Sequence, residues 1–363
     1  GGRQALTGLA DTLDQLREAQ PDLKQGILTA AVEQICSINL ELDGAPDPNV
    51  SLRELGLDSL MSIPVINDIE NLFGKRLPAR ALLRGPSVTE LTAMVREELG
   101  ELFDHAPAES DPSTGDADSS LDASPSVKKP TSKAASSGSW LVVQRPRPEA
   151  RFRLFCFPFA GGGSAVFDNW GDAFDPSIEI VSVEAPGRLG RIDEEPVRTV
   201  EQFARGLIPE LEKKLDRPYA VMGHCLGGLT LYETLRFFQA RGNQMPDHIF
   251  VSGARPPSVL RASGNFEAEL NQRLKSYGQF QAGKLGHEQP DEVFAEIVRA
   301  FGISESSKML EEEELRKLIL PTVRAEFEMT SRYVYLPERP FPIPITCFRG
   351  LRDEYFRAID AKI

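Results

Sequence analysis

The chain has 363 residues, of which 41% are hydrophobic and 26% are charged, so it is long enough for two domains and ordinary in composition for a soluble protein. Its formal net charge of −13 argues against a nucleic-acid partner, because phosphate binding needs a basic surface. No apolar run approaches the roughly 20 residues of a membrane span and the first residues lack a signal segment, so we expect no membrane partner.

The first hundred residues carry a helical pattern. Apolar residues recur at spacings of three and four in ILTAAVEQICSINL, and again in SLMSIPVINDIENLF after a loop that contains proline. Asp58 is a favourable N-cap for the second of these helices, which Ser59 would open and Gly74 would end. A last helix, SVTELTAMVREEL, starts at a Ser87 or Thr89 cap. These segments predict a small all-α bundle of four helices.

The bundle resembles an acyl carrier protein. The resemblance rests on LGLDSL, on the amphipathic helix that follows it, and on the FG, LP and PSVTEL elements downstream; it covers residues 20–103, after an N-terminal extension at 1–19. In that family the serine of D-S-L carries 4′-phosphopantetheine. The resemblance therefore implies Ser59 as the attachment site, a phosphopantetheinyl transferase as a partner, and a polyketide or fatty-acid type of carrier. Pro64 departs from the pattern, because it removes a helical N–H and should loosen the start of the helix on which carrier partners dock.

Residues 104–139 divide the chain. This segment has no aromatic residue and is dominated by Ser, Asp, Pro, Ala and Gly, so it cannot bury enough apolar surface to offset the entropy of ordering it. We predict a disordered, flexible linker with a reach of roughly 30–36 Å.

Strands and helices alternate after the linker. Strand patterns occur at FRLFCF, IEIVSV, YAVMGH, HIFVS and ITCF, with amphipathic or loop segments between them. This alternation predicts a mostly parallel sheet over residues 140–363, with helices on both faces and the functional site at the carboxyl ends of the strands. The elbow motif described below resembles that of α/β-hydrolases and implies their fold. The amphipathic run from Val293 to Phe301 predicts a helical lid, residues 264–302, that covers the site and sets the acyl length.

The stretch YAVMGHCLGGL turns sharply from a strand into a helix. It has the pattern of the G-x-S-x-G nucleophile elbow with Cys225 in place of serine. Gly223 and Gly227 let the strand and helix backbones approach closely, and the start of the helix favours the thiolate. We therefore expect Cys225 to be a nucleophile. The amides of Leu226 and of Ala160, which lies in the AGGG loop after an earlier strand, would form the oxyanion hole.

In α/β-hydrolases an acid and then a histidine follow the nucleophile along the chain. Asp353 comes directly after the strand ITCF and is the first choice for the acid, with Glu354 as the alternative. Asp216, before the elbow strand, is expected to be a surface loop residue.

No histidine follows this acid in the sequence. We reject the adjacent His224, because neighbouring side chains at such a turn point apart. We expect His248 to be structural and His287 to lie in a surface loop. Because the last residues have the pattern of the middle of a helix, we expect the catalytic histidine beyond Ile363. Without this general base, the chain should accept an acyl group on Cys225 but release it slowly.

Residues 150–363 resemble a type II thioesterase of polyketide and nonribosomal peptide pathways. The matching stretches are LFCFPFAGGGSAVFDNW, VEAPGRLGRIDEEP, MGHCLGG, HIFVSGARPP, LRKLILPTVRAEFEMTSRYVY and ITCFRGLRDE. The resemblance implies Cys225 in the role of the serine nucleophile, Asp353 in that of the acid, and the two amides named above as the oxyanion hole. The cysteine, a longer region at 264–302 and the fusion to a carrier depart from the family.

The two resemblances together imply a carrier–thioesterase didomain of a polyketide or hybrid synthase. An acyl or polyketide chain delivered by upstream synthase domains would pass from Ser59 to Cys225 and leave with water, an amine or an alcohol. Alternatives are an editing thioesterase, an amide- or ester-forming acyltransferase, an inactive module that only presents the carrier, and a dienelactone-hydrolase-like enzyme, which shares G-x-C-x-G-G.

Three explanations for sulfur at the elbow stay open: an engineered replacement of serine, a native preference for amine acceptors, and plain hydrolysis. The other cysteines, Cys36, Cys156 and Cys347, lie in apolar helix or strand patterns, where buried free thiols are expected. The absence of a C-x-x-C pair fits a reducing cytoplasm, and we expect no metal site.

Overall fold

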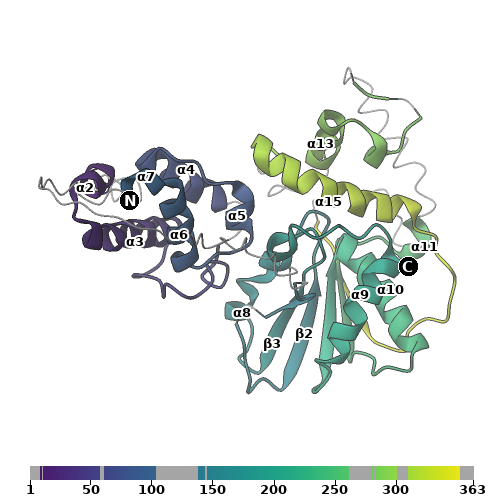
Figure 1. The fold of residues 1–363 in the computed structure, drawn as a ribbon. Coiled ribbons are helices and arrows are strands. Elements are labelled where there is room, and N and C mark those ends of the chain that lie inside the picture. The colour runs from purple at the N-terminus through teal and green to yellow at the C-terminus, as the bar shows by residue number, and fades with distance from the viewer. Residues whose placement is uncertain are drawn as a thin grey trace, which may run out of the picture.

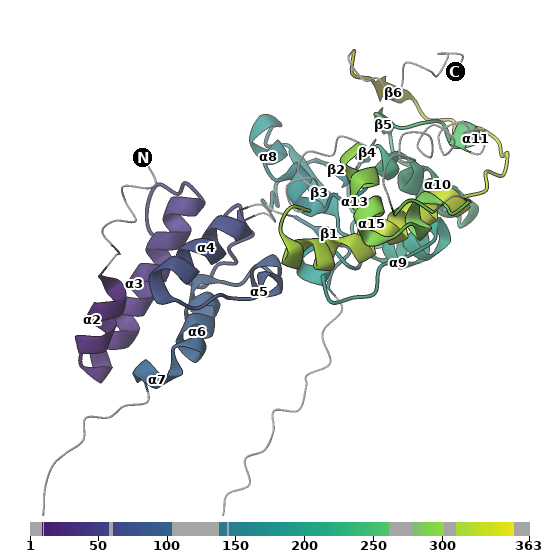
Figure 2. The same ribbon diagram turned by 90° about the horizontal axis from the view of Figure 1, so that it is seen from above.

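The computed structural model describes residues 9, 11–57, 61–103, 138–143, 145–260, 279–281, 283–300 and 310–351. They form a helical domain and an α/β domain that lie side by side (Figures 1 and 2). Most of the predicted linker, at 104–137, lies outside the described residues, as do Ser59 and Asp353. No helix within the described ranges is long and apolar enough to cross a membrane.

The helical domain follows the predicted apolar pattern. Its helices are α2 (Thr12–Glu18), α3 (Pro21–Asn39), α4 (Ser62–Phe73), α5 (Ala79–Leu83), α6 (Val88–Glu98) and α7 (Gly100–Phe103). The first of these lies in the predicted N-terminal extension and buries Leu16 completely in the bundle core. The predicted all-α bundle is therefore confirmed, with additional short helices at its edges.

The ends of two of these helices have clear local causes. α4 ends at Gly74, which has the left-handed φ of 66° that glycine adopts without steric cost. Ser87 caps α6, because its side chain accepts a hydrogen bond from the Glu90 amide and its own amide donates to the Glu90 carboxylate. Pro64 is the third residue of α4 as described, so its missing N–H falls among the first-turn amides that have no acceptor within that helix.

The α/β domain contains the predicted strands and one more. Its strands are β1 (Leu141–Val142), β2 (Phe152–Phe157), β3 (Ile178–Val183), β4 (Tyr219–His224), β5 (His248–Ser252) and β6 (Ile345–Phe348). Its helices are η2 (Ser164–Phe167), α8 (Trp170–Ala173), η3 (Leu189–Arg191), α9 (Val200–Glu212), α10 (Leu226–Ala240), α11 (Pro257–Leu260), η4 (Gly286–Glu288), α13 (Asp291–Ala300) and α15 (Glu313–Arg332). In space the strands follow the order β1-β3-β2-β4-β5-β6. All neighbours are parallel except β1, which pairs antiparallel to β3.

Alternate residues of the central strands face opposite layers, as the period of two requires. Phe155 and Val221 pack with residues of α9 and α10 on one face. Leu154 and Met222 pack with η2 and α8 on the other. The predicted helix–sheet–helix arrangement is thus confirmed.

One long helix, α15, lies across an end of the sheet (Figure 1). Thr322 of α15 donates a hydrogen bond to the carbonyl of Gly187, which follows β3. Glu326 accepts one from the amide of Gly161, which follows β2. Since both of these loops leave the carboxyl ends of parallel strands, α15 covers the end of the sheet where a site is expected.

Candidate active site

Cys225 stands between β4 and α10 in the geometry of a nucleophile elbow. Its φ of 52° and ψ of −114° are rare for a residue with a side chain, and its thiol is exposed. The Cys225 amide donates to the carbonyl of Ser252 at the end of β5, with 2.9 Å between nitrogen and oxygen. Such backbone strain persists only where the surrounding structure enforces it, and it concentrates at functional sites.

The glycines around Cys225 are required by close backbone contacts. A Cβ atom at Gly227 would lie 2.1 Å from the carbonyl oxygen of Phe157, at the end of β2. A Cβ atom at Gly223 would lie 2.6 Å from the carbonyl oxygen of Gly227, across the turn itself. The motif G-H-C-L-G is therefore a steric requirement of this turn, because only glycine allows α10 to start against the ends of β2 and β4.

The two predicted oxyanion donors belong to segments that meet at this point. Leu226 is the first residue of α10, so its amide is one of the four that have no acceptor within the helix. Ala160 lies in the turn after β2, and the close approach of Gly227 to Phe157 shows that this turn and the start of α10 adjoin.

The loop that contains Ala160 is held by a buried ion pair. The Arg188 side chain donates to the carboxylate of Glu326, with a shortest distance of 2.5 Å, and also to the carbonyl of Gly161 at 2.9 Å. The same carboxylate accepts from the amide of Gly161 at 2.8 Å. Both carboxylate and guanidinium are nearly buried, with side-chain exposures of 12% and 6%. Glu326 and Arg188 thus fix both the amide and the carbonyl of Gly161, a role that was not predicted for either residue from the sequence.

An apolar cleft lies beside the elbow. It encloses about 460 Å³ of empty space, part of it open to solvent, and its walls come from the loops after β2 and β3, from α9 and α10, and from α15. Its lining includes Phe159, Val183, Phe203, Leu226 and Met329, with Glu326 as its one charged group among the described residues. Of the described residues, α15 lines this cleft and α13, in the predicted lid at 264–302, does not.

One histidine differs from the sequence-based expectation. His287 was expected in a surface loop, but it is buried, with 6% exposure, and its Nδ1 lies 3.1 Å from Ser331 Oγ on α15. Arg324 of the same helix donates to the carbonyls of His287 and Gln289 and thereby holds the loop against α15. Burial lowers the pKa of His287.

The other two described histidines contact neighbouring strands. His224 Nδ1 lies 3.0 Å from the carbonyl oxygen of Ser252, and its ring meets that of Phe159 edge to face. His248 opens β5, and its Nε2 lies 2.8 Å from Thr346 Oγ1 on β6, which is a contact between strands.

The predicted acid, Asp353, and its alternative, Glu354, lie outside the described residues. β6, which precedes them, pairs with β5, and β5 pairs with the β4 strand that ends at the elbow. Cys347, on β6, was expected to be buried but is exposed, because β6 is the edge strand of the described sheet. Cys36 and Cys156 are buried as expected, and none of the four cysteines, all of which are described, forms a disulfide.

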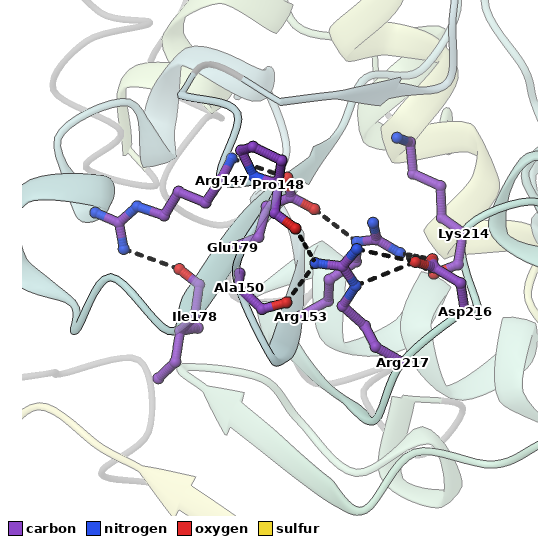
Figure 3. Close-up of polar contacts among 9 residues, drawn as sticks. All are labelled: Arg147, Pro148, Ala150, Arg153, Ile178, Glu179, Lys214, Asp216 and Arg217. Carbon is purple, nitrogen blue, oxygen red and sulfur yellow. Dashed lines mark hydrogen bonds and ion pairs between the residues drawn. The ribbon is translucent and has the colours of Figure 1, made fainter.

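A second group of charges lies at the opposite end of the sheet (Figure 3). Arg153 is buried at the start of β2, where it pairs with Glu179 at 2.6 Å and with Asp216. Arg217 also donates to Asp216, and Arg147 donates to Glu179 through its amide. Because this network joins the amino ends of three strands, away from Cys225, it is structural.

The pKa values within this network follow from its contacts. The Arg153 hydrogen bond lowers the pKa of Asp216 to about 2. Burial is the largest single effect and would raise the pKa of Glu179, but the hydrogen bonds from Arg153 and from the Arg147 amide, with the nearby positive charges, together outweigh it, so the net shift is downward. Asp216 is half exposed, in agreement with the expected surface position.

Comparison with known proteins accounts for both domains. Residues 152–361 match the thioesterase domain family, and residues 28–95 match the phosphopantetheine attachment site family. The gramicidin S biosynthesis protein GrsT of Aneurinibacillus migulanus is 31% identical over 214 residues, which are 59% of this chain and 75% of the relative. The thioesterase PikA5 of Streptomyces venezuelae is 30% identical over 219 residues, which are 60% of this chain and 70% of the relative.

Among solved structures, the RedJ thioesterase of the prodiginine biosynthetic pathway in Streptomyces coelicolor is 30% identical, with a TM-score of 0.46 over 56% of this chain and 68% of its own. The phosphopantetheine attachment match implies covalently attached 4′-phosphopantetheine. The family match over 152–361 spans more than half of the chain. The chain therefore belongs to the thioesterase domain family and carries a phosphopantetheine attachment domain ahead of its thioesterase domain.

Proposed function

We propose that this chain takes an acyl group from its own carrier domain onto Cys225 and then releases it. The observation that carries the proposal is an exposed cysteine held at positive φ in a strand–helix elbow beside an apolar cleft. The presence of a carrier domain in the same chain supports a tethered substrate. The carrier domain, together with relatives named as a gramicidin S biosynthesis protein and as the thioesterase PikA5, supports a role in nonribosomal peptide or polyketide-type biosynthesis, with upstream synthase domains as partners.

The residues around the proposed attachment point fit a phosphopantetheine group. Ser59 lies between Leu57, which is buried in the carrier core, and Ser62, where the described part of α4 begins. The amino end of a helix of this length favours an anion such as a phosphodiester, because its first amides have no acceptor within the helix and the helix dipole is positive there. The bound group supplies a thiol that holds the acyl chain as a thioester.

The first proposed step forms the acyl-enzyme. The thiolate of Cys225 attacks the thioester carbonyl carbon, a carbon–sulfur bond forms at Sγ, and the departing thiol takes up a proton. The amides of Ala160 and Leu226 would stabilise the oxyanion, and removing one such donor typically costs 10²–10³-fold in rate. The acyl chain would lie in the cleft, where each buried methylene contributes about 0.8 kcal/mol.

The second proposed step returns the free enzyme. Water attacks the acyl carbon, the carbon–sulfur bond to Cys225 breaks, and the attacking oxygen loses its proton to a general base, which contributes roughly 10²–10⁴-fold. We propose Asp353 as the acid that orients this base. In the sequence it follows β6, whose carboxyl end is aligned through β5 with the end of β4 that leads into Cys225.

Release to an amine is the second candidate, and the identity of residue 225 favours it. A thioester at Cys225 reacts with amines in preference to water more readily than the oxygen ester of a serine would. A Cys225→Ser variant separates the two reactions. If amine release is the native reaction, the wild type forms mainly amide from a supplied amine and the serine variant shifts towards the acid, whereas simple hydrolysis predicts the acid as the main product of both.

Intact-mass spectrometry after addition of a diffusible acyl thioester tests the nucleophile. We expect one acyl group per chain in the wild type, none in Cys225→Ala, and an undiminished adduct in Cys347→Ala, which removes the other exposed thiol. Equal acylation of Cys225→Ala would refute the assignment.

Labelling by a phosphopantetheinyl transferase and a fluorescent coenzyme A tests the carrier. The label should be lost in Ser59→Ala and retained in Ser62→Ala, the nearest serine along the chain. Label that survives in Ser59→Ala would place the attachment elsewhere.

A further inference from the structure

Opposite charges line the two sides of the boundary between the domains. The carrier side presents arginines at positions 53, 76, 80 and 84. The thioesterase side presents carboxylates at positions 184, 193, 312 and 314. Every ion pair that crosses this boundary in the described residues joins a carrier arginine to a thioesterase carboxylate. We define these two sets as the basic face and the acidic face.

The centre of the contact is the pair of Arg53 and Glu184. Arg53 Nη2 lies 2.6 Å from Glu184 Oε2, and the side-chain exposures of the two residues are 15% and 2%. Arg53 also donates to Ser164 Oγ at 2.9 Å, and that hydroxyl donates to Glu184 at 2.5 Å. A carboxylate this deeply buried needs a cationic partner, and here the partner comes from the other domain.

Two glycines, one in each domain, make room for Arg53. A Cβ atom at Gly85 of the carrier would lie 2.3 Å from Arg53 Cδ. A Cβ atom at Gly190 of the thioesterase domain would lie 2.5 Å from Arg53 Nη1. Arg53 therefore lies in a narrow space bounded by a glycine of each domain. Its ion pair with Glu184 thus differs from a surface ion pair between long, mobile side chains.

The rim of the contact is more exposed. Asp193 accepts from Arg84 Nε at 2.8 Å and lies 3.1 Å from Arg80 Nε. Glu314, near the start of α15, accepts from the amide of Ala79 at 2.7 Å. Figures 1 and 2 both show α5 beside α15.

Apolar packing joins the same elements. The buried apolar residues of the carrier, of α13 and of α15 form one continuous cluster, so apolar packing accompanies the ion pairs at this boundary.

The Arg53 contact joins the loop that precedes Ser59 in the sequence to the loop that follows β2. Ser164, which Arg53 contacts, directly follows the Gly161–Gly163 turn. Arg53 lies in a compact loop closed by a hydrogen bond from the Leu57 amide to the Leu52 carbonyl, and this loop leads into Ser59. The contact that anchors the carrier thus lies six residues before Ser59 in the sequence and directly after the loop that would stabilise the oxyanion.

We propose that the acidic face is a docking surface for the basic face of the chain's own carrier domain, with Glu184 as its anchor, and that this docked arrangement is the one that delivers the acyl group. The thioesterase domain would then select carriers by an arginine at the position of Arg53. The delivery part rests on the proposed function above, whereas the docking part does not depend on any chemistry at Cys225.

Hydrogen exchange of the full-length chain tests docking by itself. The Ala79 amide, which donates across the interface, should exchange faster in Arg53→Glu and in Gly190→Ala. The methyl group added by Gly190→Ala would occupy the space of the Arg53 guanidinium without changing a charge. The double variant Arg53→Glu/Glu184→Arg should regain part of the protection. Arg17→Glu is the matched control, because it reverses a charge on α2 at an arginine whose described ion pair is with Asp14. The exchange rate of the Ala79 amide in this variant should equal that of the wild type.

Two single-turnover rates of Cys225 acylation test delivery. One uses an acyl group loaded on the carrier of the same chain, and the other a diffusible acyl thioester. The ratio of the first rate to the second should fall at least about tenfold in Arg53→Glu, because a buried interfacial charge loses its partner. A wild-type exchange rate at Ala79 in both Arg53→Glu and Gly190→Ala would overturn docking. Loss of protection with an unchanged or increased ratio would overturn delivery. If neither substrate acylated Cys225, that result would contradict the proposed function but would leave the hydrogen-exchange test of docking unaffected.

Discussion

Replacing Gly227 by alanine tests whether the elbow depends on contact between backbones. The new Cβ atom would lie 2.1 Å from the carbonyl oxygen of Phe157 and 2.7 Å from that of Pro158, whereas real Cβ atoms essentially never come closer than 3.0 Å to another heavy atom. The start of α10 and the end of β2 must therefore separate by about 0.9 Å. Neither contact can be relieved by the rotation of a side chain, because both partners are backbone atoms.

The expected cost follows from this displacement. Overpacking of this kind destabilises by about 1–3 kcal/mol, which corresponds to a fall in Tm of about 2–12 °C for a domain of this size. A misplacement near 1 Å at a reacting group costs about 10²-fold in rate, so Cys225 acylation should slow by about that factor. Calorimetry and a single-turnover acylation assay measure the two effects.

Gly171→Ala is the matched control in the same domain. Its Cβ atom would meet only the flexible side chain of Arg145, at 3.4 Å, so neither Tm nor acylation should change appreciably. If Gly227→Ala kept the wild-type Tm and acylation rate, glycine would not be a steric requirement of this turn.

Three further outcomes are expected. Glu326→Ala removes the acceptor that holds the oxyanion loop, so it should lower kcat by about tenfold with a smaller effect on KM. Glu326→Gln should restore part of the lost kcat. An effect on KM alone would contradict a positioning role for Glu326. The Arg153 contact keeps the pKa of Asp216 at about 2, below the value of about 3.9 in the unfolded chain. The stabilisation from the ionised Asp216 is therefore complete above a pH of about 3.9 and is lost as the pH falls towards 2. Asp216→Asn should flatten the dependence of Tm on pH in this range, and an unchanged loss of Tm in acid would contradict this. Burial raises the pKa of Cys36 to about 12, so peptide mass spectrometry after brief alkylation should find Cys225 modified and Cys36 intact, the reverse order being incompatible with the fold.

Much of the fold could be predicted because its signals are local. The elbow strand, the last strand at Ile345–Phe348, the end of α4 at Gly74 and the cap at Ser87 all occur where the pattern placed them. Each depends on residues within about one turn or one strand of itself, through the period of the apolar residues or the conformational preference of one side chain.

The candidate site was predictable in part for the same reason. The elbow is a contiguous motif, so Cys225 and its flanking glycines could be identified without knowledge of the fold. The assignment of Asp353 used chain order and a strand boundary, and it stays a prediction. The expected positions of His287 and Cys347 were wrong, because burial depends on which element packs over a residue: α15 covers the first, and the second lies on an edge strand.

By itself, the sequence determined the two domains, most of the helical and strand segments and the turn at Cys225, since each of these is encoded in a short window. Only the tertiary structure decided that Glu326 holds Gly161, 165 residues earlier in the chain, and that Arg53 is the counter-ion of Glu184, 131 residues later. These pairings depend on where α15 crosses the sheet and on how the carrier packs against it. Both are set by the summed packing of many side chains, which no local pattern of charges reveals.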